Sequence, residues 1–248
     1  PEDVVLLTAG VDVQDNRLEI SIIGFARDDE SYVLDHVTLY GDPSTPQLWT
    51  NLDSILNRQF ETESGRQIAI RGSCVDSGGH FTNSVYAYCK KNQGRRIFAI
   101  KGVGGEGKPM VGRPSKNNIA KCPLFPIGVD TAKDLIFARM KIQEAGAGYM
   151  HFSDELNEEY FRQLTAEKVM TRFHKGFKRR VFEKIRPRNE ALDCMVYALA
   201  AYGILGVDVN SFADRAVAKE EKPVEEPKKT AKNTFIPRTG RGFTNSWR

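Results

Sequence analysis

The chain has few of the residues that build zinc sites and disulfide frameworks. It contains four cysteines and four histidines in 248 residues. The cysteines stand far apart, with no CxxC pair and no Cys/His ligand spacing, which argues against a zinc site or a set of disulfides. We expect all of them to be reduced thiols in the core, where free cysteine behaves as a small hydrophobic residue. They are Cys74, Cys89, Cys122 and Cys194.

Long apolar runs are also missing. No stretch approaches the roughly 20 apolar residues of a membrane span, and the start does not resemble a signal peptide. We therefore expect a soluble, intracellular protein with no membrane partner. Because the first residue is Pro1 rather than methionine, we expect a fragment of a longer protein. The 40% hydrophobic content predicts one compact domain over residues 1–208, followed by a charged, disordered tail over 209–248.

The first half of the chain has the pattern of an α/β fold. Alternating and continuous apolar runs separated by turn residues predict three antiparallel strands, after which strands and helices alternate. This pattern predicts a mixed central sheet flanked by helices. The expected strands are Val4–Val13, Arg17–Phe25, Ser31–Tyr40, Ile68–Asp76 and Arg96–Lys101, and the expected helices are Gln47–Phe60 and His80–Lys91.

The second half predicts a loop, three helices and a hairpin. Glycine, proline and lysine are frequent between Gly102 and Lys121, which favours a mobile loop. Capping residues and apolar spacing predict the helices, and two β-prone segments around a His-Lys-Gly-Phe bend predict the hairpin. The expected helices are Thr131–Gln143, a helix capped at Ser153–Glu155 that ends near Gln163, and Glu190–Leu205, and the hairpin arms are Val169–Phe173 and Arg180–Ile185.

Three separated aspartates stand where a strand or helix would hold them. Asp12 and Asp76 each end a run that reads as a buried strand, and Asp193 lies within a largely apolar helix. An acid in such a place is costly unless a cation meets it. Carboxylates are the oxygen ligands that Mg²⁺ and Mn²⁺ prefer, and two such ions about 4 Å apart can support attack on a phosphodiester. The pattern therefore predicts a metal-dependent nuclease site.

Each aspartate also has a structural explanation. Asp12 could belong to a turn with the polar residues that follow it, and Asp76 could cap the helix after it. Asp193 could form an ion pair with Arg186 or Arg188. Three further residues are candidates for supporting roles. Glu190 could orient a metal-bound water or pair with Arg188, His80 could contact phosphate or cap a helix, and Lys101 could reach phosphate or stay solvated.

The segment from Lys168 to Arg188 is strongly basic. It holds nine lysines or arginines against one acid, Glu183. Such a stripe suits a polyanion, because each neutralised phosphate releases counterions. A solvated basic hairpin without a partner would have the same sequence pattern. With no base-reading motif present, we expect binding to duplex phosphates with little sequence preference. The predicted DNA-binding residues are Lys175, Lys178, Arg179, Arg180 and Arg188.

Three motifs together resemble one family. Gly10–Gln14 reads Gly-Val-Asp-Val-Gln, Val75–His80 reads Val-Asp-Ser-Gly-Gly-His, and Arg188–Cys194 reads Arg-Asn-Glu-Ala-Leu-Asp-Cys. In order and spacing these motifs closely resemble the nuclease domain of the lambda-type large terminase subunit of tailed bacteriophages. The resemblance extends from about Leu6 to Gly206. Any one motif alone would be weak evidence, and the agreement of all of them is specific.

The resemblance implies an RNase H-like fold in which Asp12, Asp76 and Asp193 hold two divalent ions, Mg²⁺ or Mn²⁺. It implies endonucleolytic cleavage of concatemeric double-stranded viral DNA during packaging in the host cytoplasm. Expected partners are an N-terminal ATPase domain, the small terminase subunit, and the portal or procapsid. Two other functions remain open: a Holliday-junction resolvase or transposase-like nuclease of the same fold, and a docking module that binds DNA or portal without cutting.

Overall fold

Nine strands in the described part of the chain form one mixed sheet. The computed structural model describes residues 1–116, 121–174 and 176–220. The sheet order is β7-β8-β6-β5-β1-β2-β3-β9, with β4 paired to β5. The first three strands are antiparallel, and β5, β6 and β8 add in parallel beside β1. This arrangement is the RNase H-like fold that the sequence predicts. The strands are β1 (Leu6–Gln14), β2 (Arg17–Phe25), β3 (Ser31–Tyr40), β4 (Gln59–Glu61), β5 (Gln67–Asp76), β6 (Ile97–Val103), β7 (Ser115–Lys116), β8 (Pro123–Gly128) and β9 (Met150–Phe152).

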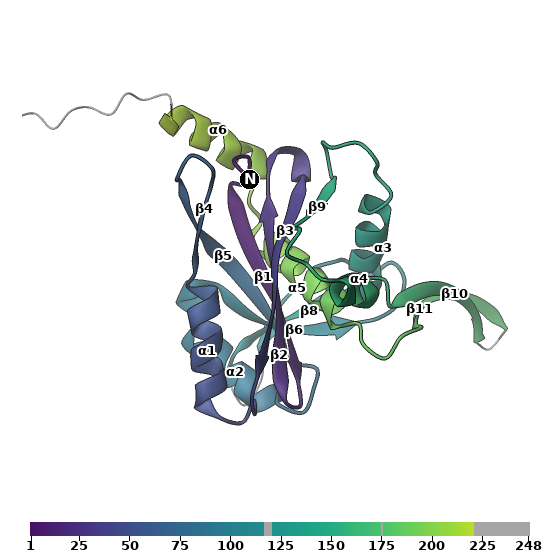
Figure 1. Ribbon diagram of the computed structural model, residues 1–248. Helices are drawn as coiled ribbons and strands as arrows, with labels where there is room; N and C mark the ends of the chain where they lie inside the picture. The colour runs from purple at the N-terminus through teal and green to yellow at the C-terminus, as the bar shows by residue number, and fades with distance from the viewer. Residues whose placement is uncertain (117–120, 175, 221–248) are drawn as a thin grey trace, which may run out of the picture.

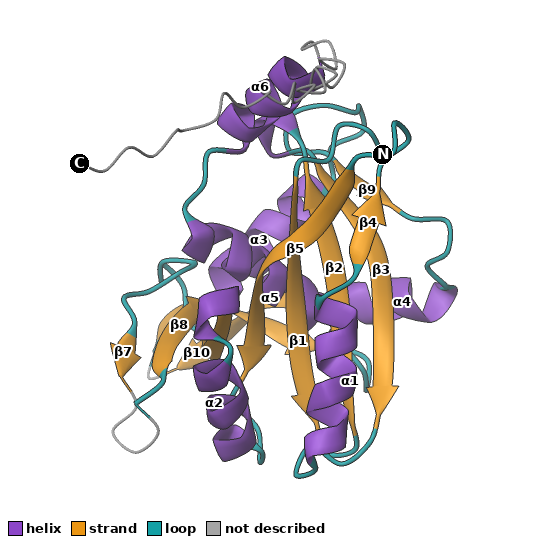
Figure 2. Ribbon diagram, turned by 90° about the vertical axis from the view of Figure 1, so that its left-hand side faces the viewer, coloured by secondary structure: helices purple, strands orange, loops and turns teal. Residues whose placement is uncertain are grey.

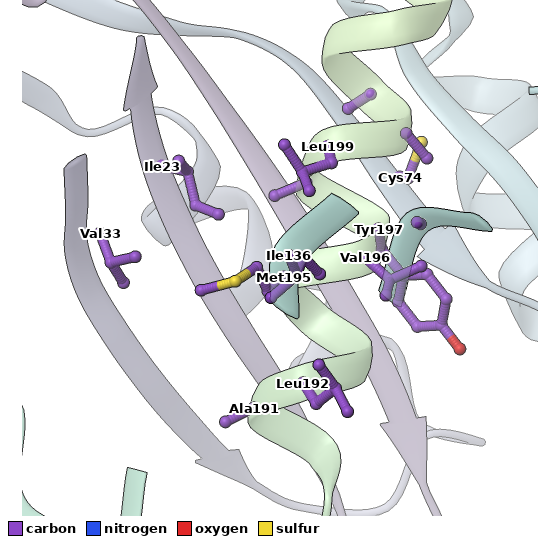
Figure 3. Close-up of a cluster of buried hydrophobic side chains, with 14 of the residues drawn as sticks. Ile23, Val33, Cys74, Ile136, Ala191, Leu192, Met195, Val196, Tyr197 and Leu199 are labelled. Atoms are coloured by element: carbon purple, nitrogen blue, oxygen red, sulfur yellow. The ribbon is translucent and has the colours of Figure 1, made fainter. Parts of the chain in front are cut away.

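Helices cover both faces of the sheet (Figure 1). Helices α1 (Pro46–Leu56) and α2 (Thr82–Lys91) lie on one face, where Leu52 and Val85 pack against the apolar side chains of β1 and β2. Helices α3 (Val129–Arg139), α4 (Glu158–Leu164) and α5 (Glu190–Leu205) lie on the other. Between its first turn and its last, α5 is buried on nearly every side, and Figure 3 shows its apolar side chains between the sheet and α3.

A two-stranded hairpin projects from the face that carries α3 (Figure 1). Its strands are β10 (Glu167–His174) and β11 (Phe177–Lys184). It is longer than the sequence pattern indicates, and it is anchored to α3 by stacking of Phe182 on Phe137 and by an ion pair between Arg180 and Asp134. The tip therefore extends from a fixed base.

Several boundaries differ from the sequence expectations. The sequence predicts a disordered tail from residue 209, but residues 209–220 form an amphipathic helix, α6 (Val209–Glu220). Its apolar side packs on the body, with Val209 and Ala213 buried. Helix α4 begins after Asn157, whose side chain accepts the Tyr160 N–H, rather than at Ser153. Short strands β4, β8 and β9 lack the length and alternation that would distinguish them in the sequence.

Among the described residues, no single helix has the length and apolar character needed to cross a membrane. Taken together, α5 and the start of α6 reach that length and composition, but they are bent by 77° relative to each other. In this structure α5 is the central buried helix of the fold.

Candidate active site

The end of β1 places Asp12 on the sheet face that carries α5. Side chains alternate between the two faces of a strand, so Thr8, Gly10 and Asp12 share one face. Thr8 Oγ1 donates a hydrogen bond to the Ala198 carbonyl at 2.8 Å. A Cβ atom on Gly10 would collide with the backbone of Cys194 and Ala198. Glycine therefore lets α5 lie directly against β1, with Asp12 next along the same face.

Strand β5 places Asp76 beside Asp12. The two strands are parallel neighbours with Val11 opposite Val75. The aspartates that follow are thus adjacent, on strands that lie about 4.8 Å apart. Cys74, two residues before Asp76, belongs to the core cluster under α5. Asp76 therefore faces the same helix as Asp12.

Helix α5 brings Asp193 to these strand ends because it runs antiparallel to both strands. Leu205, at the end of α5, lies against Gly72 of β5, whereas Cys194, in the first turn, lies against Gly10. The first turn of α5 is thus level with the ends of β1 and β5. The structure brings all three predicted acids, Asp12, Asp76 and Asp193, to one place.

Burial raises the pKa of every acid in this group, and the charge of Asp193 adds to the shift of Asp12 and of Asp76. Removal from water, and then the charge of Asp193, raise the pKa of Asp12 to about 8. Removal from water also raises the pKa of Asp76 to about 6, although the backbone N–H of Gly78 opposes the shift. Burial raises the pKa of Asp193, opposed by the Lys133 ammonium. The group is a concentration of negative charge that a cation would stabilise.

Lys133 of α3 supplies one such cation. Its Nζ lies 2.7 Å from Glu167 Oε1 and 3.3 Å from Asp193 Oδ1, and the side chain is buried. Asn189 completes the cluster, since its amide donates to Glu167 at 2.7 Å and to Asp193 at 2.9 Å. Asp193 therefore pairs with a lysine from another helix rather than with Arg186 or Arg188.

A second ion-pair network lies next to Asp12. Glu19 is fully buried and accepts hydrogen bonds from Arg17 and Arg188, each at 2.6 Å. Glu190 accepts from the same two arginines, at 2.9 Å and 3.2 Å. The negative charge of Glu190 also raises the pKa of Asp12. Glu190 thus belongs to the surroundings of the site, and Arg188 is held beside it.

The other two supporting candidates, Lys101 and His80, differ in their surroundings. Lys101, at the end of β6, is close enough for its charge to lower the pKa of Asp76. The exposed His80 has its Nδ1 2.8 Å from a carboxylate oxygen of Asp15. The candidate roles of Lys101 and His80 at phosphate stay predictions.

The predicted DNA-binding residues divide into two groups. Lys178 and Arg179 are exposed on β11, and the neighbouring aromatic side chains Phe173 and Phe177 are 69% and 74% exposed. Arg180 is bound to Asp134, as Arg188 is bound to the glutamates. Lys175 lies outside the described residues. Lys178 and Arg179 are therefore the members of the predicted set most available to an external ligand.

No three His, Cys, Asp or Glu side chains in the described ranges are close enough together to hold a metal ion as they stand. The acids share one end of the sheet, but their oxygens do not converge on a single point. Gln14 Nε2 holds Asp12 Oδ2 at 2.6 Å, and Lys133 holds Asp193. These contacts stabilise the separated arrangement.

Sequence reasoning missed Lys133, Glu167 and Asn189 as members of this site. The sequence does contain an indication for Lys133. This lysine shares a helical face with Ile136 and Phe137, and a lysine on an apolar face requires a partner of opposite charge. For Glu167 the sequence gives no such indication, because this acid lies just before the hairpin arm that the sequence predicts, Val169–Phe173, and is the first residue of β10 in the structure. Asn189 precedes α5, where an asparagine is typical of a helix cap, but its side chain binds the two carboxylates and makes no capping hydrogen bond.

Comparison with known proteins identifies the family of the chain. Residues 1–215 match the family described as the terminase large subunit gpA, endonuclease domain. The terminase large subunit of Enterobacteria phage P21 is 33% identical over 97% of this chain and 38% of the relative. That of Escherichia phage lambda is 35% identical over 82% of this chain and 33% of the relative. No solved structure matches the chain. The chain spans about a third of the length of each relative. It belongs to the family of terminase large subunit endonuclease domains.

Proposed function

We propose that this domain cuts double-stranded DNA by metal-dependent phosphodiester hydrolysis, with Asp12, Asp76 and Asp193 as the metal ligands. The observation that carries the proposal is their placement: β1, β5 and α5 bring one buried and two partly buried carboxylates to the same end of the sheet, and removal from water raises the pKa of each. A cluster of acids that repel one another destabilises the metal-free fold. Its presence therefore favours a functional role for the acids. Clusters of this kind occur mostly at functional sites.

The donor set fits divalent metal ions. Asp76 Oδ1 is buried and has no hydrogen-bond partner in the described part of the chain. An unsatisfied buried carboxylate oxygen is costly, and a bound cation would satisfy it. Carboxylate oxygens are the ligands that Mg²⁺ and Mn²⁺ prefer. When bound, a pair of such ions would lower the pKa of the attacking water and stabilise the leaving 3′ oxygen.

The protein itself would contribute positioning and charge. The sheet and α5 hold the acids rigidly at one end of the domain, and Gln14 orients Asp12. Lys133 holds Asp193 next to Glu167, and its ammonium reduces the net negative charge that a DNA phosphate would meet. Metal binding by all three acids would require their oxygens to move closer together and Asp12 to lose its proton.

The relatives support a proposal for the biological substrate. Both curated relatives are terminase large subunits of phages. We propose concatemeric viral DNA as the substrate, cut when packaging begins and ends. Because the chain covers about a third of those proteins, contacts with an ATPase domain, a small terminase subunit and a portal or procapsid are likewise proposals.

Cleavage of supercoiled plasmid tests the nuclease assignment. We expect nicking or linearisation with Mg²⁺ or Mn²⁺, none with EDTA, and none with Asp76→Ala under any condition. Asp154→Ala is the matched control, because Asp154 is an exposed acid outside the site. Cleavage by Asp76→Ala at the wild-type rate would show that the acids do not form the cutting centre.

The hairpin should set the salt dependence of DNA binding. Replacing Lys178 and Arg179 with glutamine removes two exposed charges, so the slope of log affinity against log salt should fall by about 2. Affinity for a duplex, measured by fluorescence anisotropy in metal-free buffer, should fall most at low salt. The control exchanges two exposed cations elsewhere, Lys141→Gln and Arg162→Gln. An unchanged slope in the hairpin variant would mean that the hairpin does not contact phosphate.

A further inference from the structure

A large polar cavity lies at the opposite end of β5 from the acids. Its volume is about 530 Å³, within the roughly 300–1,000 Å³ of small-ligand sites. It is bordered by the first half of β5, by the turn and start of β6, and by Phe212 of α6. The cavity-lining residue of β5 nearest to the acids is Ser73, and the three residue steps from Ser73 to Asp76 correspond to about 10 Å of strand. The cavity is therefore separate from the candidate cutting centre, as the course of β5 in Figure 2 shows.

The lining of this cavity is cationic. Four arginines contribute to it, and its described lining contains no aspartate or glutamate. Asn57, Gln59 and Gln67 add further hydrogen-bond donors around the rim. The arginines are Arg66, Arg71, Arg95 and Arg96. Arg66 is bound to Glu2 and Arg95 to Asp53, so Arg71 and Arg96 supply the positive charge that an anion would meet.

Two of these arginines are available for a ligand. Arg95 is bound to Asp53 at 2.5 Å and to neighbouring amide oxygens. Arg71 and Arg96 are exposed, and neither guanidinium makes an ion pair or hydrogen bond within the described residues. The Arg71 guanidinium lies 5.7 Å from the centre of the Phe212 ring, which holds it at the cavity wall. A pre-positioned guanidinium loses little freedom when it binds.

We propose that this cavity binds phosphoryl groups. Guanidinium groups match phosphate oxygens through paired hydrogen bonds, and several arginines around one concave space suit an anion with several charges close together. Two sources share this chemistry: a free nucleoside triphosphate and the backbone of DNA. The concave shape favours the compact nucleotide, since a duplex presents a convex surface to the protein.

The test measures binding to the whole chain in buffer freed of divalent metals by resin, because EDTA is itself an anion that could occupy the cavity. Titration calorimetry uses ATP, inorganic phosphate and a 20-base-pair duplex as separate probes. The variant carries Arg71→Gln and Arg96→Gln, and the control carries Lys141→Gln and Arg162→Gln, which remove the same charge from outside the cavity. Loss of two charge-assisted contacts should weaken ATP binding about tenfold or more.

The three probes separate the outcomes. A nucleotide site is supported if the cavity variant, but not the control variant, binds ATP and phosphate more weakly than wild type does. Weaker duplex binding in the cavity variant alone supports a second DNA contact. Equal affinity of wild type, variant and control for all three probes overturns the proposal. Melting curves for each variant confirm folding, and Phe212→Leu, which keeps both charges but removes the aromatic support of Arg71, should weaken binding less than the double substitution.

Discussion

Asp12→Asn should abolish DNA cleavage and, in metal-free buffer at pH 8, raise the melting temperature. The two effects have one cause. Asp12 is buried among other acids, and its pKa is raised to about 8. Asparagine has the same shape and can still accept the hydrogen bond from Gln14, but it carries no charge. Removing the repulsion should stabilise the metal-free fold by on the order of 1–3 kcal/mol, while the lost carboxylate can no longer ligate a metal.

The pH dependence of this gain has a definite sign. An acid whose pKa is higher in the folded state than in the unfolded state keeps its proton longer when folded. Between the ordinary carboxyl value near 4 and the folded value of about 8 for Asp12, the folded protein therefore binds more protons, and its stability falls as pH rises. Asp12→Asn should thus match wild type near pH 4 and exceed it increasingly up to pH 8.

Thermal unfolding of wild type and variant across this pH range, with plasmid cleavage measured on the same samples, tests both effects. Asp154→Asn is the control, since that exposed acid should alter neither cleavage nor the pH profile. A variant that still cuts, or one that is less stable than wild type at pH 8, would contradict the assignment of Asp12 as a charged ligand within a repelling cluster.

The positions of the acids could be predicted because each rests on a local pattern. An apolar run ending in aspartate predicts a buried strand with an acid at its end, and this identified Asp12 and Asp76. Alternation along the strands then puts both on one face. The close contact of α5 depends on Gly10, which has no side chain to signal it. The sequence therefore indicates which residues form the site more readily than how closely they approach.

The surroundings of the acids depend on contacts between distant segments. Arg17, Glu19, Arg188 and Glu190 form one network although more than 160 residues separate its two halves. No local pattern distinguishes such arginines from solvated ones. The possible pairing of Glu190 with Arg188 is confirmed, but the contacts of both arginines with Glu19 were not predicted. Helix α6 was missed for a different reason: it is short of apolar residues and precedes a charged segment, and only its packing against the body shows that it is part of the fold.

Lys133→Met should have the opposite effect on stability from Asp12→Asn. The ammonium is buried between Glu167 and Asp193, at 2.7 Å and 3.3 Å from their oxygens. Methionine fills the apolar part of the space but leaves the buried Glu167 and the partly buried Asp193 without their cation. Removing one partner of a buried ion pair costs about 3–5 kcal/mol, although Asn189 still donates to both acids and should reduce this loss.

The loss should be largest at high pH, where Asp193 is ionised. Without the opposing lysine the pKa of Asp193 rises further, so protonation at low pH relieves the repulsion and the difference from wild type shrinks toward pH 4. The control for the loss of charge is Lys141→Met, because Lys141 is an exposed lysine just beyond the same helix. Chemical denaturation at pH 5 and pH 8 measures the difference. If Lys133→Met and Lys141→Met unfold alike at both pH values, Lys133 does not stabilise the acids. If Lys133→Met alone is weakened at pH 8, the negative charge of the site is held in place by a cation that the protein itself supplies.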